Sequence, residues 1–283
     1  MTTAIPPAPL PAPPPATTAA RIRWTMADGW TLVRRDLGHI WYEPGQILGA
    51  LVFPAVMVVL FGYVFGSAIA VPGGGNYRDY LMPGLFVMTA VTGIMATLNV
   101  VAADVGRGVM DRFRSMPMAR SAVPFGQTGA YAVQAVFSFV IMAAMGLLVG
   151  WRAHNGIAAA FGGFALLLLF SYSLTWAGVF LGLLVKNEET ADQLVPLVFP
   201  VTMISNTFVP TAGMPAWLRT IADWNPVSAA VAACRGVFGS AGASAASTAW
   251  PLTHPIVATL AWSGLLLAVF VPLSVRRYTT ARR

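Results

Sequence analysis

The chain has 283 residues, of which 57% are hydrophobic and only 10% are charged, and its formal net charge is +7. A soluble domain carries about 25% charged residues, so the 17 basic and 10 acidic residues here cannot cover the surface of a water-soluble globule of this length. The composition argues against a soluble enzyme, and the single cysteine argues against a disulfide-stapled secreted domain. We therefore predict an all-α integral membrane protein.

The N-terminal segment is predicted to lie outside the hydrocarbon core. Seven of the first 15 residues are proline, so residues 1–20 are expected to form a disordered, Pro-rich cytoplasmic tail. Over residues 24–42, apolar residues recur every three or four positions beside a basic face. This Trp-rich pattern fits an amphipathic helix at the membrane interface, an elbow before the first span. An ordinary cytoplasmic helix is the alternative.

Six stretches without Asp, Glu, Lys or Arg are predicted to cross the membrane, because a hydrocarbon core about 30 Å thick needs roughly 20 apolar helical residues. They are residues 46–66, 80–103, 123–151, 156–185, 193–208 and 255–275. Prolines at positions 196 and 200 interrupt the fifth stretch. With the elbow, these spans form a predicted transmembrane domain over residues 24–277, followed by a basic cytoplasmic tail at 278–283.

The distribution of basic residues predicts the orientation of the spans. If both termini are cytoplasmic, 13 of the 17 Lys and Arg residues fall on the inner side and four on the outer side. The outer four are Arg78, Arg152, Arg219 and Arg235. A basic chain can also indicate a nucleic-acid partner, but these residues lie between apolar runs, so we interpret them as topology signals. We expect a multi-pass protein of the plasma membrane and no nucleic-acid partner.

The segment between the fifth and sixth spans is predicted to stay on the outer side. Pro210, Pro215 and Pro226 divide it into short, moderately apolar pieces. These pieces cannot cross a bilayer, and irregular backbone at membrane depth needs protein or water to satisfy it. We expect an external re-entrant hairpin that dips into or lies on the outer leaflet.

Motifs for chemistry are missing from the sequence. The single lysine, Lys186, does not stand in a phosphate-binding loop, and the three histidines lie in separate regions without nearby ligands. No predicted span carries an ionisable residue at its centre, which argues against a carrier driven by protons or sodium. We expect no catalytic, cofactor or metal site in this chain.

The loop between the second and third spans mixes basic residues with exposed apolar ones. A loop on the positive side explains its arginines, but it does not explain Phe113 and the methionines on either side of Pro117. Flexible methionines and an aromatic ring flanked by charges are typical of a protein-docking surface. We therefore interpret this loop as a binding site for a partner protein; a solvated loop is the alternative.

Residues 111–126 (DRFRSMPMARSAVPFG) resemble the cytoplasmic loop of ABC-2 type transporter permeases of the daunorubicin- and doxorubicin-resistance group. The later motifs FVP at 208–210, MPAWL at 214–218 and WNPV at 224–227 stand in the order found in that family. The resemblance covers about residues 25–277 and leaves out the Pro-rich tail. It implies six spans after an elbow helix, a coupling helix in the loop, and a re-entrant hairpin between spans five and six.

The resemblance also implies a separate cytoplasmic ATPase subunit, which would hold ATP and Mg²⁺, and a second permease chain. By position, the predicted coupling contacts with the ATPase are Asp111, Arg112, Phe113, Arg114, Met116 and Met118. Glu188 and Glu189 match a family position near the ATPase, although an ordinary inner loop also explains them. Five residues within the spans are candidates to line a substrate path: Phe53, Met57, Asn99, Ser205 and Asn206.

The function implied by this reading is that of a permease subunit of an ATP-binding-cassette exporter. It would move a hydrophobic or amphipathic drug, antibiotic or lipid out of the cell, and the partner would hydrolyse the ATP. A membrane scaffold that uses the loop only for assembly is the alternative, and a secondary carrier is the weaker one. The residues do not distinguish the substrate, the ATPase or a homodimer from a heterodimer.

Overall fold

The computed structural model describes residues 52, 56–60, 77–109, 122–185, 188–209, 211–240 and 248–280, and every regular element in these ranges is helical. Four long helices are α3 (Tyr77–Gly106), α5 (Ala122–Val149), α6 (Gly156–Leu184) and α11 (Pro255–Thr280). Shorter elements are α7 (Glu188–Met203), η2 (Thr211–Gly213), α8 (Ala216–Trp224), α9 (Pro226–Phe238) and α10 (Trp250–Thr253). Residues 56–60 are also helical.

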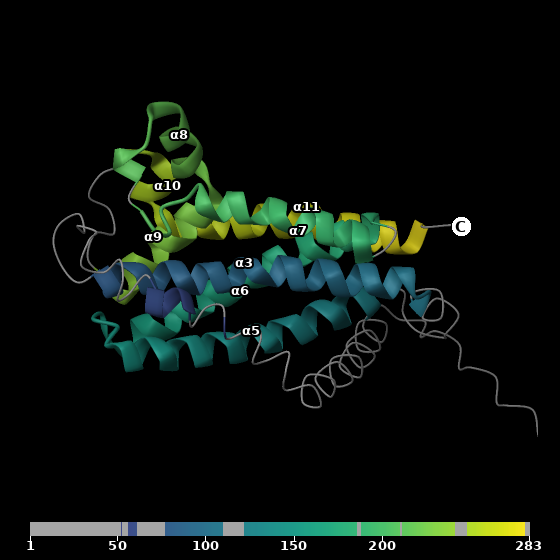
Figure 1. Ribbon diagram of the computed structural model, residues 1–283, viewed down its shortest axis with the longest axis horizontal. Coiled ribbons are helices and arrows are strands. Elements are labelled where there is room, and N and C mark those ends of the chain that lie inside the picture. The colour runs from purple at the N-terminus through teal and green to yellow at the C-terminus, as the bar shows by residue number, and fades with distance from the viewer. Residues whose placement is uncertain are drawn as a thin grey trace, which may run out of the picture.

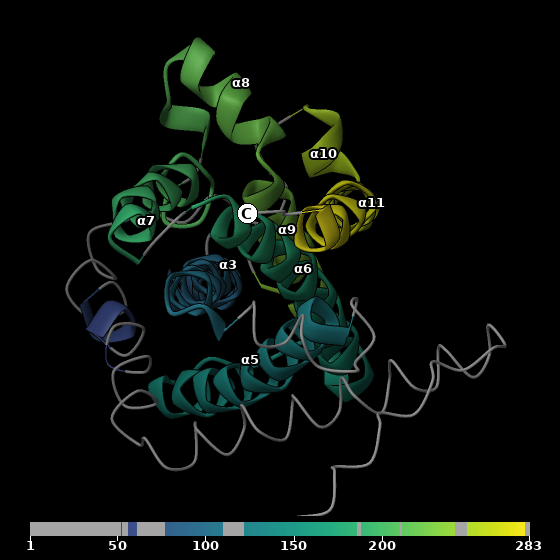
Figure 2. The ribbon, with the colours of Figure 1, turned by 90° about the vertical axis from the view of Figure 1, so that its right-hand side faces the viewer.

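The long helices lie side by side with their ends at two common levels (Figure 1). One end carries α8, α9 and α10, and we call it the hairpin end. At the other end lie the end of α3, the start of α7 and the end of α11, and we call it the loop end because the predicted coupling loop connects α3 to α5 there. Viewed along the bundle, α3 lies between α7, α6 and α5 (Figure 2). This central position explains why its side chains are the most buried of the four long helices.

Glycines bring α6 and α3 into close contact. A Cβ atom on Gly178 would lie 2.7 Å from the Ile94 carbonyl oxygen, and one on Gly182 would lie 2.9 Å from the Leu98 carbonyl oxygen. Two glycines four residues apart form one flat strip on a helix. The backbones of α6 and α3 approach each other along this strip.

Aromatic rings fill the core near the hairpin end. Phe86 of α3 packs edge-on against Trp151, Phe164 and Phe238, with ring centroids 5.2, 5.3 and 5.8 Å away. These rings come from α3, α6, α9 and the turn after α5. They therefore join the hairpin helix α9 to the long helices, and Trp151 and Phe238 are both buried.

Four helices of the described chain are long and apolar enough to cross a bilayer, namely α3, α6, α11 and most of α5. They match the second, third, fourth and sixth predicted spans, with ends that differ by a few residues. The fifth predicted span corresponds to α7, whose 16 residues are fewer than a simple crossing needs. The first predicted span lies mostly outside the described residues, as do the Pro-rich tail, the elbow, the coupling loop and residues 281–283.

Candidate functional site

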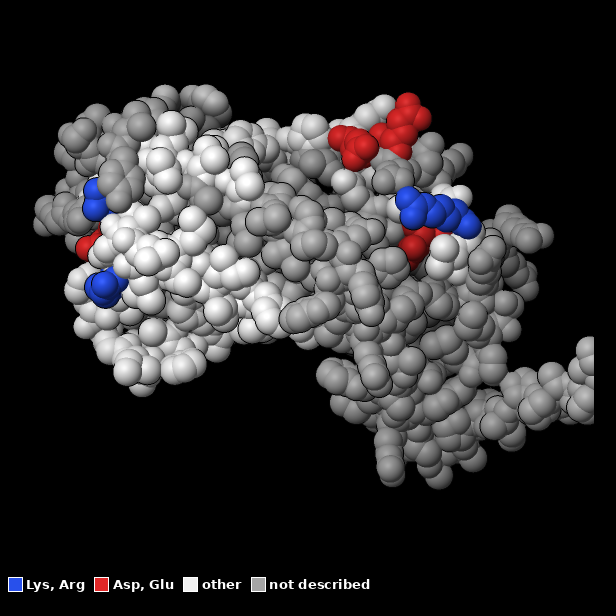
Figure 3. Space-filling model, turned by 60° about the horizontal axis from the view of Figure 1, so that its bottom comes forward, with Lys and Arg blue, Asp and Glu red and all other residues white. Residues whose placement is uncertain are grey.

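On the face shown in Figure 3, the charged side chains of the described residues lie toward the two ends of the molecule. Apolar side chains are exposed on the long helices between these ends, among them Phe137 and Val140 of α5 and Leu265 of α11. An apolar belt between charged ends is the surface expected of a protein that spans a bilayer. The features that could carry function therefore lie at the two ends.

Polar side chains tie the helices together near the loop end. The Gln127 side-chain amide of α5 donates a hydrogen bond to Asp104 of α3 over 3.0 Å. The Asn99 amide of α3 donates to the Asp192 carboxylate of α7 over 3.2 Å. The predicted coupling loop connects the end of α3 to the start of α5. The bond between Gln127 and Asp104 therefore holds these two helix ends together.

The first turns of α7 are acidic. Glu188 is its first residue, and the exposed residues Glu189 and Asp192 follow. Negative charge at the N-terminus of a helix is favoured by the helix dipole. The carboxylates of Glu189 and Asp192 therefore stabilise the start of α7 whether or not they also contact a partner.

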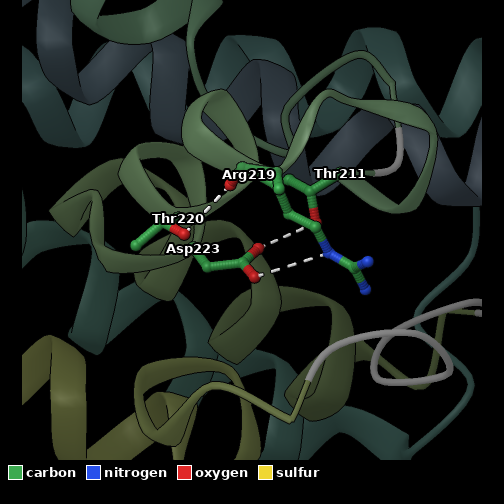
Figure 4. Close-up of polar contacts among 5 residues, drawn as sticks. Thr211, Arg219, Thr220 and Asp223 are labelled. Atoms are coloured by element: carbon green, nitrogen blue, oxygen red, sulfur yellow. Dashed lines mark hydrogen bonds and ion pairs between the residues drawn. The ribbon is translucent and has the colours of Figure 1, made fainter.

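At the hairpin end, α8 is strongly amphipathic. Trp217, Ile221 and Trp224 are spaced by four and three residues and are all exposed, with Trp217 at 68%. The opposite face holds Asp223, which accepts a hydrogen bond from the Thr211 hydroxyl over 2.8 Å and lies 3.9 Å from Arg219 (Figure 4). The polar face of α8 is thus turned inward onto η2, and its apolar face is turned outward.

The chain leaves helical geometry after α7, at residues 204–209, and side chains satisfy the backbone there. Asn225 donates from its amide to the carbonyl oxygens of Val201 and Ile204, each over 2.7 Å. The Asn225 side chain also accepts from the Val227 amide and so caps the start of α9. The Asn225 side chain therefore donates to carbonyl oxygens at the end of α7 and caps the start of α9. Backbone that leaves helical geometry at membrane depth needs hydrogen-bond partners of this kind within the protein.

Arg235 of α9 is the most deeply buried charge among the described residues, with 1% of its surface exposed. Its guanidinium donates to the carbonyl oxygens of Tyr80, Asn206 and Thr207 over 3.0, 2.9 and 3.0 Å. The same guanidinium carbon lies 3.5 Å from the centre of the Tyr80 ring, a cation–π arrangement. Within the described chain its partners are therefore carbonyl dipoles and an aromatic face, and it forms no ion pair with a carboxylate there.

The tyrosines of α3 complete this junction. The Tyr80 hydroxyl donates to the Asn206 carbonyl oxygen over 3.3 Å, and the Tyr77 hydroxyl donates to the Phe208 carbonyl oxygen over 3.2 Å. We call these contacts of Arg235, Tyr77 and Tyr80 with the 204–209 turn the arginine junction. Burial lowers the pKa of the Arg235 guanidinium to about 10, so this side chain stays protonated at neutral pH.

The predicted site residues fall in three groups. Six predicted coupling residues and Phe53 lie outside the described residues. Met57 is half-buried against the main core, and Asn99 bonds to Asp192 as described above. Ser205 and Asn206 are buried in the turn after α7, where the Ser205 hydroxyl donates to the Thr202 carbonyl oxygen over 2.5 Å and the backbone N–H of Asn206 donates to the Ser228 hydroxyl over 3.1 Å.

Arg235, one of the four arginines predicted on the outer side, is the tenth residue of α9 and is buried between helices. The sequence does not predict this burial. The acceptors of the Arg235 side chain are backbone carbonyls, which every residue has, so no residue pattern indicates them. The only available signal was an arginine in a run of small apolar residues (residues 226–238), where a solvated loop would be more polar.

These features define a class, a helical membrane protein with an apolar belt, a short proline-containing helix α7 and the short helices α8, α9 and α10 at one end of the long helices. Comparison with known proteins identifies the family: residues 28–238 match the model of the ABC-2 type transporter, and the chain belongs to this family of membrane permeases. It is 30% identical over 257 residues to a daunorubicin resistance ABC transporter permease protein of Streptomyces coeruleorubidus, covering 88% of this chain and 87% of the relative.

A doxorubicin resistance ABC transporter permease protein of Mycobacterium tuberculosis is 25% identical over 246 residues, with 82% of each chain covered. The resemblance noted in the sequence is thereby confirmed. The chain is a permease subunit of the ABC exporter type, a family that works with a separate ATP-binding subunit.

Proposed function

We propose that this permease exports a hydrophobic or amphipathic compound through the plasma membrane, with six spans and both termini in the cytoplasm. Similarity to a daunorubicin resistance permease over nearly the whole chain is the observation that carries this proposal. The exposed apolar belt supports a position of the chain in the bilayer, where a hydrophobic or amphipathic compound would meet it.

A dimer of permease chains, each seated on an ATPase subunit that binds ATP and Mg²⁺, is the proposed working assembly. The proposed coupling contacts are the six residues from Asp111 to Met118 named above, in the loop after α3, together with Glu188 and Glu189. The bond between Gln127 and Asp104 supports this assignment, because it would transmit a push on the loop to α3 and α5 together. Nucleotide binding by the ATPase would then shift the helices as rigid bodies.

The solute path is proposed to include Phe53, Met57, Asn99, Ser205 and Asn206. Two of these residues have a polar atom available for a solute, since the Oδ1 atoms of Asn99 and Asn206 are buried and accept no hydrogen bond within the described chain. A buried amide oxygen without a donor is costly. A hydroxyl or ammonium group on a passing solute, or a water molecule, would relieve that cost.

The proposal is tested in inverted membrane vesicles that contain the permease and the ATPase subunit from its native host. We expect ATP-dependent accumulation of fluorescent daunorubicin, and we expect Phe113→Ala with Arg114→Ala to abolish it while the vesicles retain the permease. Accumulation that is the same without ATP would contradict an ATP-driven exporter. ATP-dependent accumulation of a lipid probe, without accumulation of daunorubicin, would identify a lipid as the substrate and would still support an ATP-driven exporter.

A further inference from the structure

We propose that Arg235 is the positioning residue that holds the hairpin end closed, and that its bonds to Tyr80, Asn206 and Thr207 break when the permease opens at that end. The inference rests on the proposed transport function, because an opening of this end has a role only in a protein that passes a solute. It assigns that opening to one junction between α9, α3 and the turn after α7.

The choice of residue at this junction favours a reversible contact. Burying a charge costs free energy that only well-placed partners recover, and the partners here are three neutral carbonyl oxygens and a ring. When the junction opens, water would hydrate the guanidinium and return part of that cost. An apolar side chain would instead lose favourable burial on opening. Arg235 therefore gives a specific closed geometry without a large penalty for leaving it.

The junction joins segments that are far apart in the chain. Arg235 bonds to Tyr80, which is 155 residues away, and to Asn206 and Thr207, which are 29 and 28 residues away. Three hydrogen bonds from one side chain thus hold α9 against both α3 and the non-helical turn. The turn is the part of this junction with the fewest backbone bonds of its own, so it is the part that can move without unwinding a helix.

Helix α3 connects this junction to the loop end. It is a continuous helix of 30 residues with Pro83 inside it, and it is about 45 Å long at 1.5 Å per residue. Tyr77 and Tyr80 are in its first turn and Asp104 is in its last. If the ATPase displaces the coupling loop, α3 would therefore carry the displacement to the arginine junction as a rigid helix. No chain of side-chain contacts is needed between the two ends.

The chain carries its own reporter for this opening. Cys234 is the only cysteine, it precedes Arg235 in α9, and 1% of its surface is exposed. Burial also raises the pKa of its thiol to about 12, and since maleimides react with the thiolate, the closed junction should label slowly. No cysteine has to be introduced or removed for the measurement.

The experiment uses the permease with its native ATPase subunit in lipid nanodiscs and a sulfonated, membrane-impermeant maleimide. We expect Cys234 to be labelled roughly tenfold faster with ATP and vanadate than without nucleotide, because opening removes its protection. Arg235→Gln should raise the nucleotide-free rate toward the trapped rate. The matched control, Arg219→Gln, removes the other arginine of the external segment, whose ion pair is partly exposed, and should leave the rate unchanged.

Equal labelling rates of the wild-type complex in the two nucleotide states would overturn the proposal and leave Arg235 a static support. The wild-type comparison decides this even if Arg235→Gln cannot be isolated. ATPase activity and ATP-driven daunorubicin uptake are measured on the same purified complex reconstituted into sealed proteoliposomes. Their absence would contradict the proposed function, whereas their presence with equal labelling rates would contradict only the role given to Arg235.

Discussion

A single methyl group would disturb the contact between α6 and α3. In Gly178→Ala the new Cβ would lie 2.7 Å from the Ile94 carbonyl oxygen, a backbone atom that cannot turn away. Overpacking of this kind costs about 1–3 kcal/mol, so we expect a lower melting temperature of the detergent-solubilised permease. A maleimide dye that fluoresces on reaching buried Cys234 would report the unfolding.

Gly162→Ala is the matched control, since this glycine is in the same helix and a Cβ there meets nothing within 4 Å. Alanine is favoured over glycine in a helix by about 0.5–1 kcal/mol, so the control should melt at the same or a higher temperature. If Gly178→Ala melts no lower than Gly162→Ala, the close approach of α6 to α3 is wrong.

Gln127 is the residue that tests the link between the coupling loop and the helices. Gln127→Leu removes the amide that donates to Asp104 over 3.0 Å and keeps a side chain of similar size. We expect the variant to bind the ATPase normally but to transport several-fold less daunorubicin for each ATP hydrolysed. Gln193→Leu, on the exposed surface of α7, serves as the control. A normal ratio of transport to hydrolysis in Gln127→Leu would argue against this route of transmission.

At the scale of elements, α8 is predicted to lie in the outer membrane interface. Its apolar stripe of Trp217, Ile221 and Trp224 is exposed, and tryptophan is enriched where hydrocarbon meets headgroups. A spin label at Ile221→Cys, in a Cys234→Ala background, should be relaxed more by oxygen dissolved in lipid than by a water-soluble nickel chelate. A label at Ala216→Cys, which is exposed about 100° around the helix, should show the opposite preference. Equal water access at both positions would place α8 in solvent.

Elements differ in how far the sequence predicts them. Apolar runs predicted α3, α5, α6 and α11, because a bilayer selects long helices by composition alone. The glycine pair Gly178 and Gly182 allows a close helix contact, but nothing in the sequence identifies α3 as the partner helix. The arginine junction was missed, since its acceptors are backbone carbonyls that become available only where α7 ends. Burial of a charge on a short helix depends on tertiary packing, which leaves no periodic pattern.

At the scale of the whole molecule, a permease that spans the bilayer must have its exposed apolar belt in contact with lipid. Val140 is near the middle of the exposed face of α5, with 61% of its surface exposed. An arginine at the centre of a span costs about 2.5–3.5 kcal/mol of insertion free energy, so Val140→Arg should reduce the amount of inserted permease strongly. Val140→Leu should have no effect. Equal insertion of the two variants, measured by resistance of the membrane fraction to carbonate extraction, would indicate that protein covers this face.

The central claim is that this chain is the membrane half of an ATP-driven exporter. The most direct test is to purify the tagged permease in mild detergent from its native host and to measure the ATPase activity that copurifies. We expect the wild-type permease to retain an ATPase subunit, and we expect the variant in which Phe113 and Arg114 are both replaced by alanine to lose it. Recovery of the wild-type permease alone, or with partners that hydrolyse no ATP, would contradict the account and favour a scaffold or a self-powered carrier.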